Sequence, residues 1–187
     1  MTNQPALRVK IELADSRDGH AIRVVFPPGS STSANIALNA FILNESDTRV
    51  DYAAIGLLFD KQLGGVILPP LKGLISNGPR LSEVSGLLKG GLAVSADEYT
   101  IHWGIGEHLP IFREYQQLLF HSPLQIKVAV QPASFLIAWW VVAPGVELRT
   151  GFYMLRHRGD PALVTQGSVG DGWLEDRGEL PQGSFEI

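Results

Sequence analysis

Hydrophobic and polar positions alternate along most of this chain in stretches of about strand length. In residues 7–13 every odd position is apolar and every even position is charged. A period of two places one face of a β-strand toward a core and the other toward water. The same reasoning, applied to alternating or almost wholly apolar stretches, predicts eight strands, at residues 7–14, 21–26, 35–43, 50–59, 99–104, 124–130, 135–142 and 147–155.

The connections between these stretches suggest how the strands pair. Asp18-Gly19 and the polar residues 44–48 are turn signals, and they predict two hairpins in the first third of the chain. Short turns between the last three stretches predict a meander over residues 124–155. The stretch 135–142 is apolar on both faces, as expected for a strand at the centre of a sheet that is covered on both sides.

Residues 60–98 contain ten glycines or prolines, too many for one continuous element. Four apolar residues between positions 81 and 88 repeat at helical spacing, so we expect a long crossover with one short helix. Residues 110–120 fit either a second short helix or an extended edge strand, and the sequence leaves both open.

The fold class follows from these elements. Helices of about 10–15 residues, which a parallel α/β fold needs between its strands, are missing. We therefore expect an all-β fold, an antiparallel two-sheet Ig-like sandwich with one or two short helices in crossover loops. A closed barrel is the alternative. The expected shared core contains Leu38, Ile42, Ile55, Leu57, Ile126, Val128, Ile137 and Trp139.

Charge divides the chain near residue 158. Residues 1–158 contain 14 Lys or Arg and 13 Asp or Glu, whereas residues 159–187 contain six acidic residues and only Arg177 as a base. We expect a β-sandwich domain over 1–158 and an acidic, Gly- and Pro-rich C-terminal tail over 159–187, partly docked or loose. The body has no basic run, so nucleic acid is not an expected partner.

Composition bears on the compartment of the protein. The chain has no cysteine, which excludes disulfides and thiolate metal sites and fits a reducing compartment. Its longest strongly apolar run, residues 135–144, is too short to span a bilayer. Residues 1–5 are polar and lead directly into a strand, unlike a signal peptide. We therefore expect a cytoplasmic protein with no membrane partner.

The strongest polar constellation is His102, Glu107 and His108, within seven residues. Imidazole and carboxylate groups bind zinc or copper, so a metal-dependent enzyme built on this segment is one hypothesis. However, His102 ends a predicted strand and His108 lies beyond a Gly-x-Gly link, so nothing preorganises the three groups. We prefer a surface turn and expect no metal, no cofactor and no catalytic residue.

Trp139 and Trp140 are adjacent in a predicted strand, so their side chains face opposite sides of the sheet. We expect one in the core and the other against a second layer or an interface. An exposed Trp140 would make a good binding anchor. With the neighbouring loop 104–113, it defines a candidate interaction surface of His102, Glu107, His108, Arg113 and Trp140.

Several runs resemble a known accessory domain. They are residues 35–46, Ile101-His102-Trp103-Gly104, Pro110-Ile111-Phe112, the run 137–145, and Gly151-Phe152-Tyr153. Together they resemble the Ig-like β-sandwich that follows AlbA/Schlafen-type putative ATP- or nucleic-acid-binding domains in bacterial proteins. The resemblance covers about residues 7–157 and carries over no catalytic residue. It implies an excised or free-standing accessory module.

The function expected from the sequence is therefore a non-enzymatic interaction module that binds a protein partner or a neighbouring domain. A sandwich that binds a small ligand or carbohydrate is the alternative. A metal-dependent enzyme around His102, Glu107 and His108 is the second alternative.

Overall fold

The computed structural model describes residues 6–25, 33–70, 80–88, 92–103, 111–112, 116–129, 133–158 and 169–179. Every regular element within these ranges is a β-strand. In chain order the strands are β1 (Leu7–Leu13), β2 (Ala21–Val25), β3 (Ser33–Asn44), β4 (Ala53–Asp60), β5 (Gly65–Ile67), β6 (Arg80–Leu88), β7 (Leu92–Trp103), β8 (Gln116–Leu118), β9 (Leu124–Ala129), β10 (Ala133–Ala143), β11 (Val146–Arg158) and β12 (Val169–Glu179).

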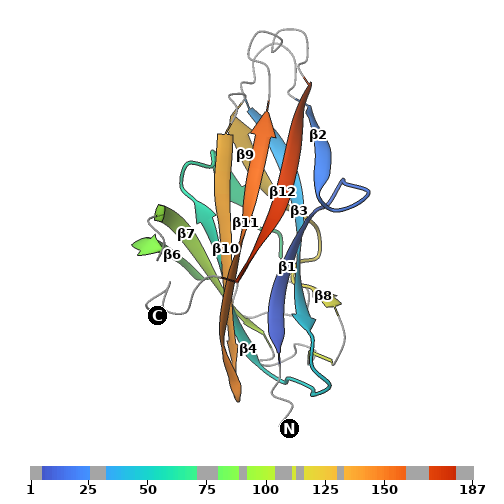
Figure 1. The fold of residues 1–187 in the computed structure, drawn as a ribbon, viewed down its shortest axis with the longest axis vertical. Helices are drawn as coiled ribbons and strands as arrows, with labels where there is room; N and C mark the ends of the chain where they lie inside the picture. Colours follow the sequence, from blue (N-terminus) through green and yellow to red (C-terminus); the bar gives the residue numbers. More distant parts are fainter. Residues whose placement is uncertain are drawn as a thin grey trace.

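The strands form two antiparallel sheets (Figure 1). The five-stranded sheet has the order β1-β3-β9-β5, with β8 also paired to β3. The seven-stranded sheet has the order β2-β12-β11-β10-β4-β7-β6. The expected all-β, antiparallel two-sheet sandwich is confirmed. None of the described residues forms a helix long and apolar enough to cross a membrane.

The two predicted hairpins are wrong, although the strands and turns that suggested them are present. β1 pairs with β3, and β2 pairs with β12 in the other sheet. Likewise β3 and β4 belong to different sheets, and in the expected meander only β10 and β11 pair with each other. Turn residues show where the chain reverses direction, but they do not specify which sheet receives the returning strand.

The inner faces of the two sheets enclose one hydrophobic core. In β1 the apolar residues Leu7, Val9, Ile11 and Leu13 are at most 2% exposed, and the charged residues between them are half-buried. The eight residues expected to share a core all lie in this cluster. Burial of each large side chain contributes about 1.5–3 kcal/mol to stability. The alternating pattern therefore located the strands and also the face of each strand that supplies this stability.

The short helix expected in the crossover is not observed where the sequence placed it. Residues Arg80–Leu88 form strand β6, which pairs residue for residue with β7, from Arg80 opposite Thr100 to Leu88 opposite Leu92. Helical spacing of a few apolar residues is a weak local preference, and pairing with a long neighbouring strand overrides it. In the ambiguous segment near 110–120, Ile111 bridges Val50 and β8 is extended.

The acidic C-terminal segment contributes a strand to the sandwich. Strand β12 lies between β11 and β2, and it pairs with both. Its Leu174 is 2% exposed and joins the core. Residues 169–179 therefore belong to the seven-stranded sheet, so this part of the segment expected to be partly docked or loose is docked in the sandwich. Glycines interrupt the apolar pattern of β12, so the alternation of apolar and polar residues did not predict this strand.

Candidate interaction surface on the seven-stranded sheet

Trp139 and Trp140 lie on opposite faces of β10, as the sequence predicted. Trp139 is 2% exposed and belongs to the core between the sheets. Trp140 belongs to a second hydrophobic cluster, separate from the core, on the outer face of the seven-stranded sheet. The sheet is therefore apolar on both faces at its centre, and its outer face carries a hydrophobic cluster outside the core.

Each tryptophan lies against a glycine of a neighbouring strand. Trp140 pairs across to Gly56 of β4, and Trp139 pairs across to Gly151 of β11. A Cβ atom at Gly56 would lie 1.9 Å from Nε1 of Trp140, and one at Gly151 would lie 2.5 Å from Cζ2 of Trp139. The two indoles therefore occupy the space of the missing side chains. Glycine within a strand often marks such a close approach.

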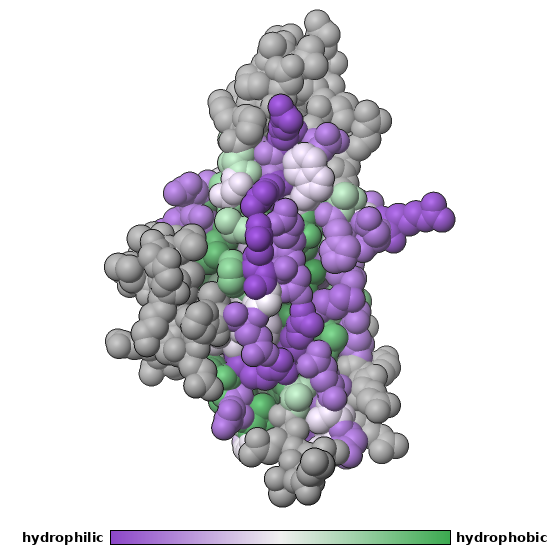
Figure 2. Space-filling view, viewed as in Figure 1, coloured by the Kyte–Doolittle hydropathy of each residue, from purple (hydrophilic) through white to green (hydrophobic). Residues whose placement is uncertain are grey.

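The outer cluster has a buried centre and a half-buried margin. Its buried members come from three adjacent strands and are Ala54, Leu58, Ala96, Leu136, Ala138 and Trp140. The half-buried residues packed against them are Tyr52, Val142, Phe152 and Met154. We call these ten residues the outer cluster. Figure 2 shows this side of the molecule, with hydrophobic surface in patches beside a band of polar side chains.

Glu98 of β7 fixes the orientation of the Trp140 indole. The Nε1 of Trp140 donates a hydrogen bond to Oε1 of Glu98, across the intervening strand β4. An acceptor that carries a charge makes this a stronger bond than one between neutral groups. The indole is thus held against Gly56, with its only polar atom satisfied.

Tyr52 and His102 form an aromatic pair on the same face. The Tyr52 hydroxyl lies 2.9 Å from Nδ1 of His102, and the two rings are stacked with centroids 6.2 Å apart. His102 is exposed, whereas its neighbours Ile101 and Trp103 are buried in the core. Because His102 pairs across to Ala54 of the outer cluster, the aromatic pair lies at the end of that cluster.

The structure thus brings two of the predicted site residues, His102 and Trp140, to one face. Trp140 is buried in the outer cluster, so the exposed anchor that the sequence allowed is not what the structure shows. Glu107, His108 and Arg113 lie outside the described residues. Within the described part of the chain, no three His, Asp or Glu side chains come together in a way that could hold a metal ion.

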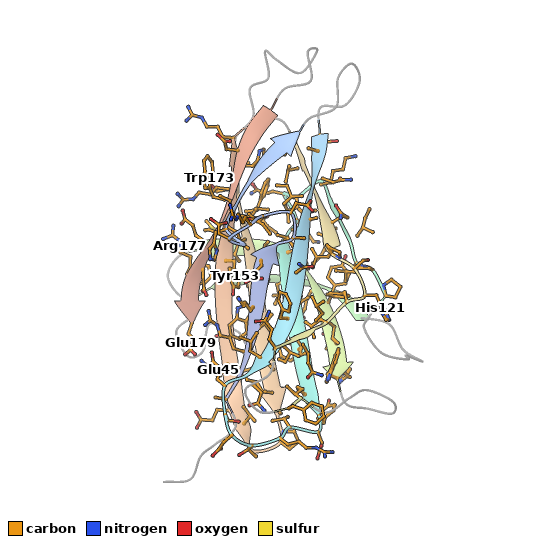
Figure 3. The ribbon with its side chains drawn as sticks, turned by 90° about the vertical axis from the view of Figure 1, so that its right-hand side faces the viewer. Glu45, His121, Tyr153, Trp173, Arg177 and Glu179 are labelled. Atoms are coloured by element: carbon orange, nitrogen blue, oxygen red, sulfur yellow. The ribbon has the colours of Figure 1, made fainter. Side chains whose placement is uncertain are left out.

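Sequence reasoning missed Tyr52, Phe152 and Met154. Their signal was present, because positions 152 and 154 alternate with the core residue Tyr153 and are themselves apolar. A strand that is apolar at both odd and even positions has hydrophobic side chains on its outer face as well as on its inner face. The exposed Trp173 of β12 was also missed as a candidate. Figure 3 labels it near the left edge of the molecule.

Ion pairs join the two sheets along the margin where β1 approaches β12. Arg8 of β1 pairs with Asp176 and lies 3.9 Å from Glu45. Arg149 lies 3.2 Å from Glu45, and its Nε lies 2.9 Å from Glu179. Burial alone would lower the pKa of Arg149, but the two carboxylates outweigh it and raise the pKa. Figure 3 shows Glu45 and Glu179 along this margin. Here acidic side chains of β12 form ion pairs with arginines of β1 and β11.

Two titratable side chains of β11 are buried in the core. Burial raises the pKa of Tyr153 and lowers the pKa of His157. The His157 ring stacks on Phe135, with centroids 5.9 Å apart and planes 12° apart. Burial in an apolar environment disfavours the charged imidazolium. His157 is therefore a neutral part of the core at neutral pH.

Comparison with protein-family models, with curated proteins and with solved structures gives no match.

Proposed function

We propose that this β-sandwich is a non-enzymatic interaction module that binds a protein partner or a neighbouring domain. The proposed contact surface consists of the half-buried margin of the outer cluster (Tyr52, Val142, Phe152 and Met154) and the exposed His102 beside it. The single observation that carries the proposal is a second hydrophobic cluster outside the core, with half-exposed aromatic residues at its edge.

Physical arguments support this assignment. Aromatic and methionine side chains are enriched in protein interfaces, where they supply contact area with few degrees of freedom to lose. The Glu98–Trp140 bond and the close Gly56 contact restrict the position of the Trp140 indole beneath this surface. A rigid surface loses less entropy when a partner binds.

The sequence resemblance supports the same class of function. Ig-like accessory sandwiches next to AlbA/Schlafen-type domains carry no catalytic residues, and we propose the same role for this chain. A cytoplasmic location forms part of the proposal, supported by the absence of cysteine. Nucleic acid is not the proposed ligand, since the sequence has no basic run and its formal net charge is −4.

Binding measurements on matched variants test the proposal. The purified protein is immobilised and used to capture a binding partner. The partner is then purified, and its affinity for the free protein is measured by calorimetry. Phe152→Ser and His102→Ala change the proposed surface, whereas Lys127→Ser changes an exposed residue on the other sheet. Loss of a well-placed interface anchor costs about 2 kcal/mol or more, roughly 30-fold in Kd.

These variants distinguish binding through the proposed surface from binding elsewhere on the protein. We expect the first two variants to weaken binding by at least tenfold and the Lys127 variant to leave it unchanged, with thermal melts showing that all three remain folded. Equal affinity of all variants, or the lack of any partner that binds with defined stoichiometry, would refute the proposed surface.

A second candidate function rests on Trp173, which is 39% exposed on the outer face of β12. The flanking residues on the same face are Asp171 and Glu175, and Arg156 lies directly across on β11. An indole ring can stack on the apolar face of a sugar ring, and these polar groups can bind its hydroxyls. A glycan array probed with the protein and with Trp173→Ser tests this, and equal signals from the two proteins would exclude it.

A further inference from the structure

The two margins of the seven-stranded sheet are built differently. One margin is β2, which has five residues, and the other is β6, which has nine. A strand at the margin of a sheet presents unpaired backbone N–H and C=O groups, and it can pair with a strand from another chain. Short edge strands limit this risk, so β6 is the margin that invites pairing.

The backbone of β6 is regular along its whole length. All nine residues pair one to one with β7, with no shift of register. Among the described residues no further strand pairs with β6, which stands at the margin of the sheet in Figure 1. An edge of this length with uninterrupted pairing on its inner side is a suitable template for an added strand.

The sequence of β6 lacks the devices that usually protect an edge. Proteins discourage edge pairing with proline, lysine or a bulge, and β6 contains none of these. Its only charged residues are Arg80 and Glu83. In contrast, the outer strand β1 of the other sheet carries a charge at every second position.

We propose that β6 pairs with β6 of a second copy of this chain, antiparallel and centred on Val84. The two seven-stranded sheets then form one continuous sheet across a two-fold axis. Closed two-fold symmetry is the commonest form of self-association, and it satisfies both edges at once. This inference is independent of the partner-binding surface, which lies on the face of the sheet rather than at its margin.

The register follows from symmetry and charge. A two-fold axis perpendicular to the sheet places residues of the same face opposite each other, so Val84 faces Val84, Leu81 faces Leu87 and Glu83 faces Ser85. All nine residues of each β6 then pair, and no like charges are opposed. The neighbouring symmetric registers, centred on Glu83 or on Ser85, each lose two pairs, and the first sets Glu83 against itself. Like charges directly opposite are destabilising.

The absence of cysteine allows a direct test by disulfide trapping. In Val84→Cys the two thiols face each other at the axis, where opposite Cα atoms lie about 4.5–5.5 Å apart, a separation that a disulfide spans. In the matched control Ser82→Cys the two thiols are four residues apart along the paired strands, about 14 Å. Mild oxidation of the full chain should yield a covalent dimer of the first variant and not of the second.

Charge variants at one position provide an independent measurement. Ser85→Lys places two opposite-charge pairs with Glu83 in the dimer, whereas Ser85→Glu places two like-charge pairs there. Sedimentation equilibrium should show dimerisation strengthened by the first change and weakened by the second, each roughly 2- to 30-fold. Thermal melts of dilute samples confirm that both variants are folded.

Several outcomes would overturn the inference. These are a wild-type protein that stays monomeric at all concentrations, equal trapping of both cysteine variants, and charge variants that shift dimerisation in the same direction. If the Ser85 variants fail to fold, the cysteine pair still decides, since cysteine at either position adds no charge to the strand.

Discussion

Substitution of Gly56 by alanine tests the close contact between β4 and the Trp140 indole. The added Cβ would lie 1.9 Å from Nε1 and 2.2 Å from Cε2 of Trp140, far inside van der Waals distance. The indole must therefore lift away from the sheet. That movement separates Nε1 from Glu98 and disturbs the packing of the outer cluster.

The magnitude follows from two contributions. Overpacking a well-packed site costs about 1–3 kcal/mol, and leaving a buried donor without its partner costs about 1–3 kcal/mol. Because Glu98 is half-buried, water can replace the indole as its donor, which favours the lower half of the combined range. We expect Gly56→Ala to lower the free energy of unfolding by about 2–4 kcal/mol.

A double-mutant cycle with Trp140→Leu isolates the contact. Unfolding by urea, followed by circular dichroism, gives the free energy of each of the four proteins. In the leucine background the alanine methyl group has room, so Gly56→Ala should cost less than about 1 kcal/mol there. If the alanine costs the same in both backgrounds, the indole does not restrict position 56, and the explanation given for the glycine is wrong.

Three further predictions concern the margins of the fold. Removal of residues 169–187 deletes β12 and isolates β2 from its sheet, so we expect loss of the cooperative thermal transition; an unchanged Tm would contradict this. Burial lowers the pKa of His157 below its usual 6.5, so the unfolded chain binds a proton that the folded chain does not. Stability should therefore fall as the pH drops below 6.5 and level off below the folded pKa, and His157→Phe should remove this slope; an equal slope in the variant would refute it. Arg149→Met removes two solvent-screened ion pairs and should cost less than about 1 kcal/mol, a loss that shrinks further in 1 M salt; a larger, salt-independent loss would mean that the arginine acts by packing.

The alternating pattern determined much of this protein on its own. It located the strands that make most of both sheets, the inward side of each, and the opposite faces of Trp139 and Trp140. These are local properties, because the direction of each side chain in a strand depends only on its position along that strand. Strand β10 is apolar at both odd and even positions, which indicated correctly that its sheet has hydrophobic residues on both faces.

Part of the candidate surface could be predicted in the same way, and part could not. The exposed position of His102 followed from its alternation with the buried Ile101 and Trp103. Its stacking on Tyr52 did not, because Tyr52 directly precedes β4 and His102 belongs to β7, and the sequence does not reveal that these two strands pair. The same limit applies to the contact of Trp140 with Gly56 and Glu98, which assembles three separate strands.

Only the tertiary structure decided which strands pair. The sequence predicted hairpins, but β1 and β2 enter different sheets, as do β3 and β4. It predicted a helix at β6 and a tail at β12, but both are strands whose partners supply their backbone hydrogen bonds. The physical reason is that a period of two fixes the face of a residue, whereas pairing depends on contacts between distant segments. Glycines in β12 and helical spacing in β6 gave weak local signals, and the neighbouring strands overrode them.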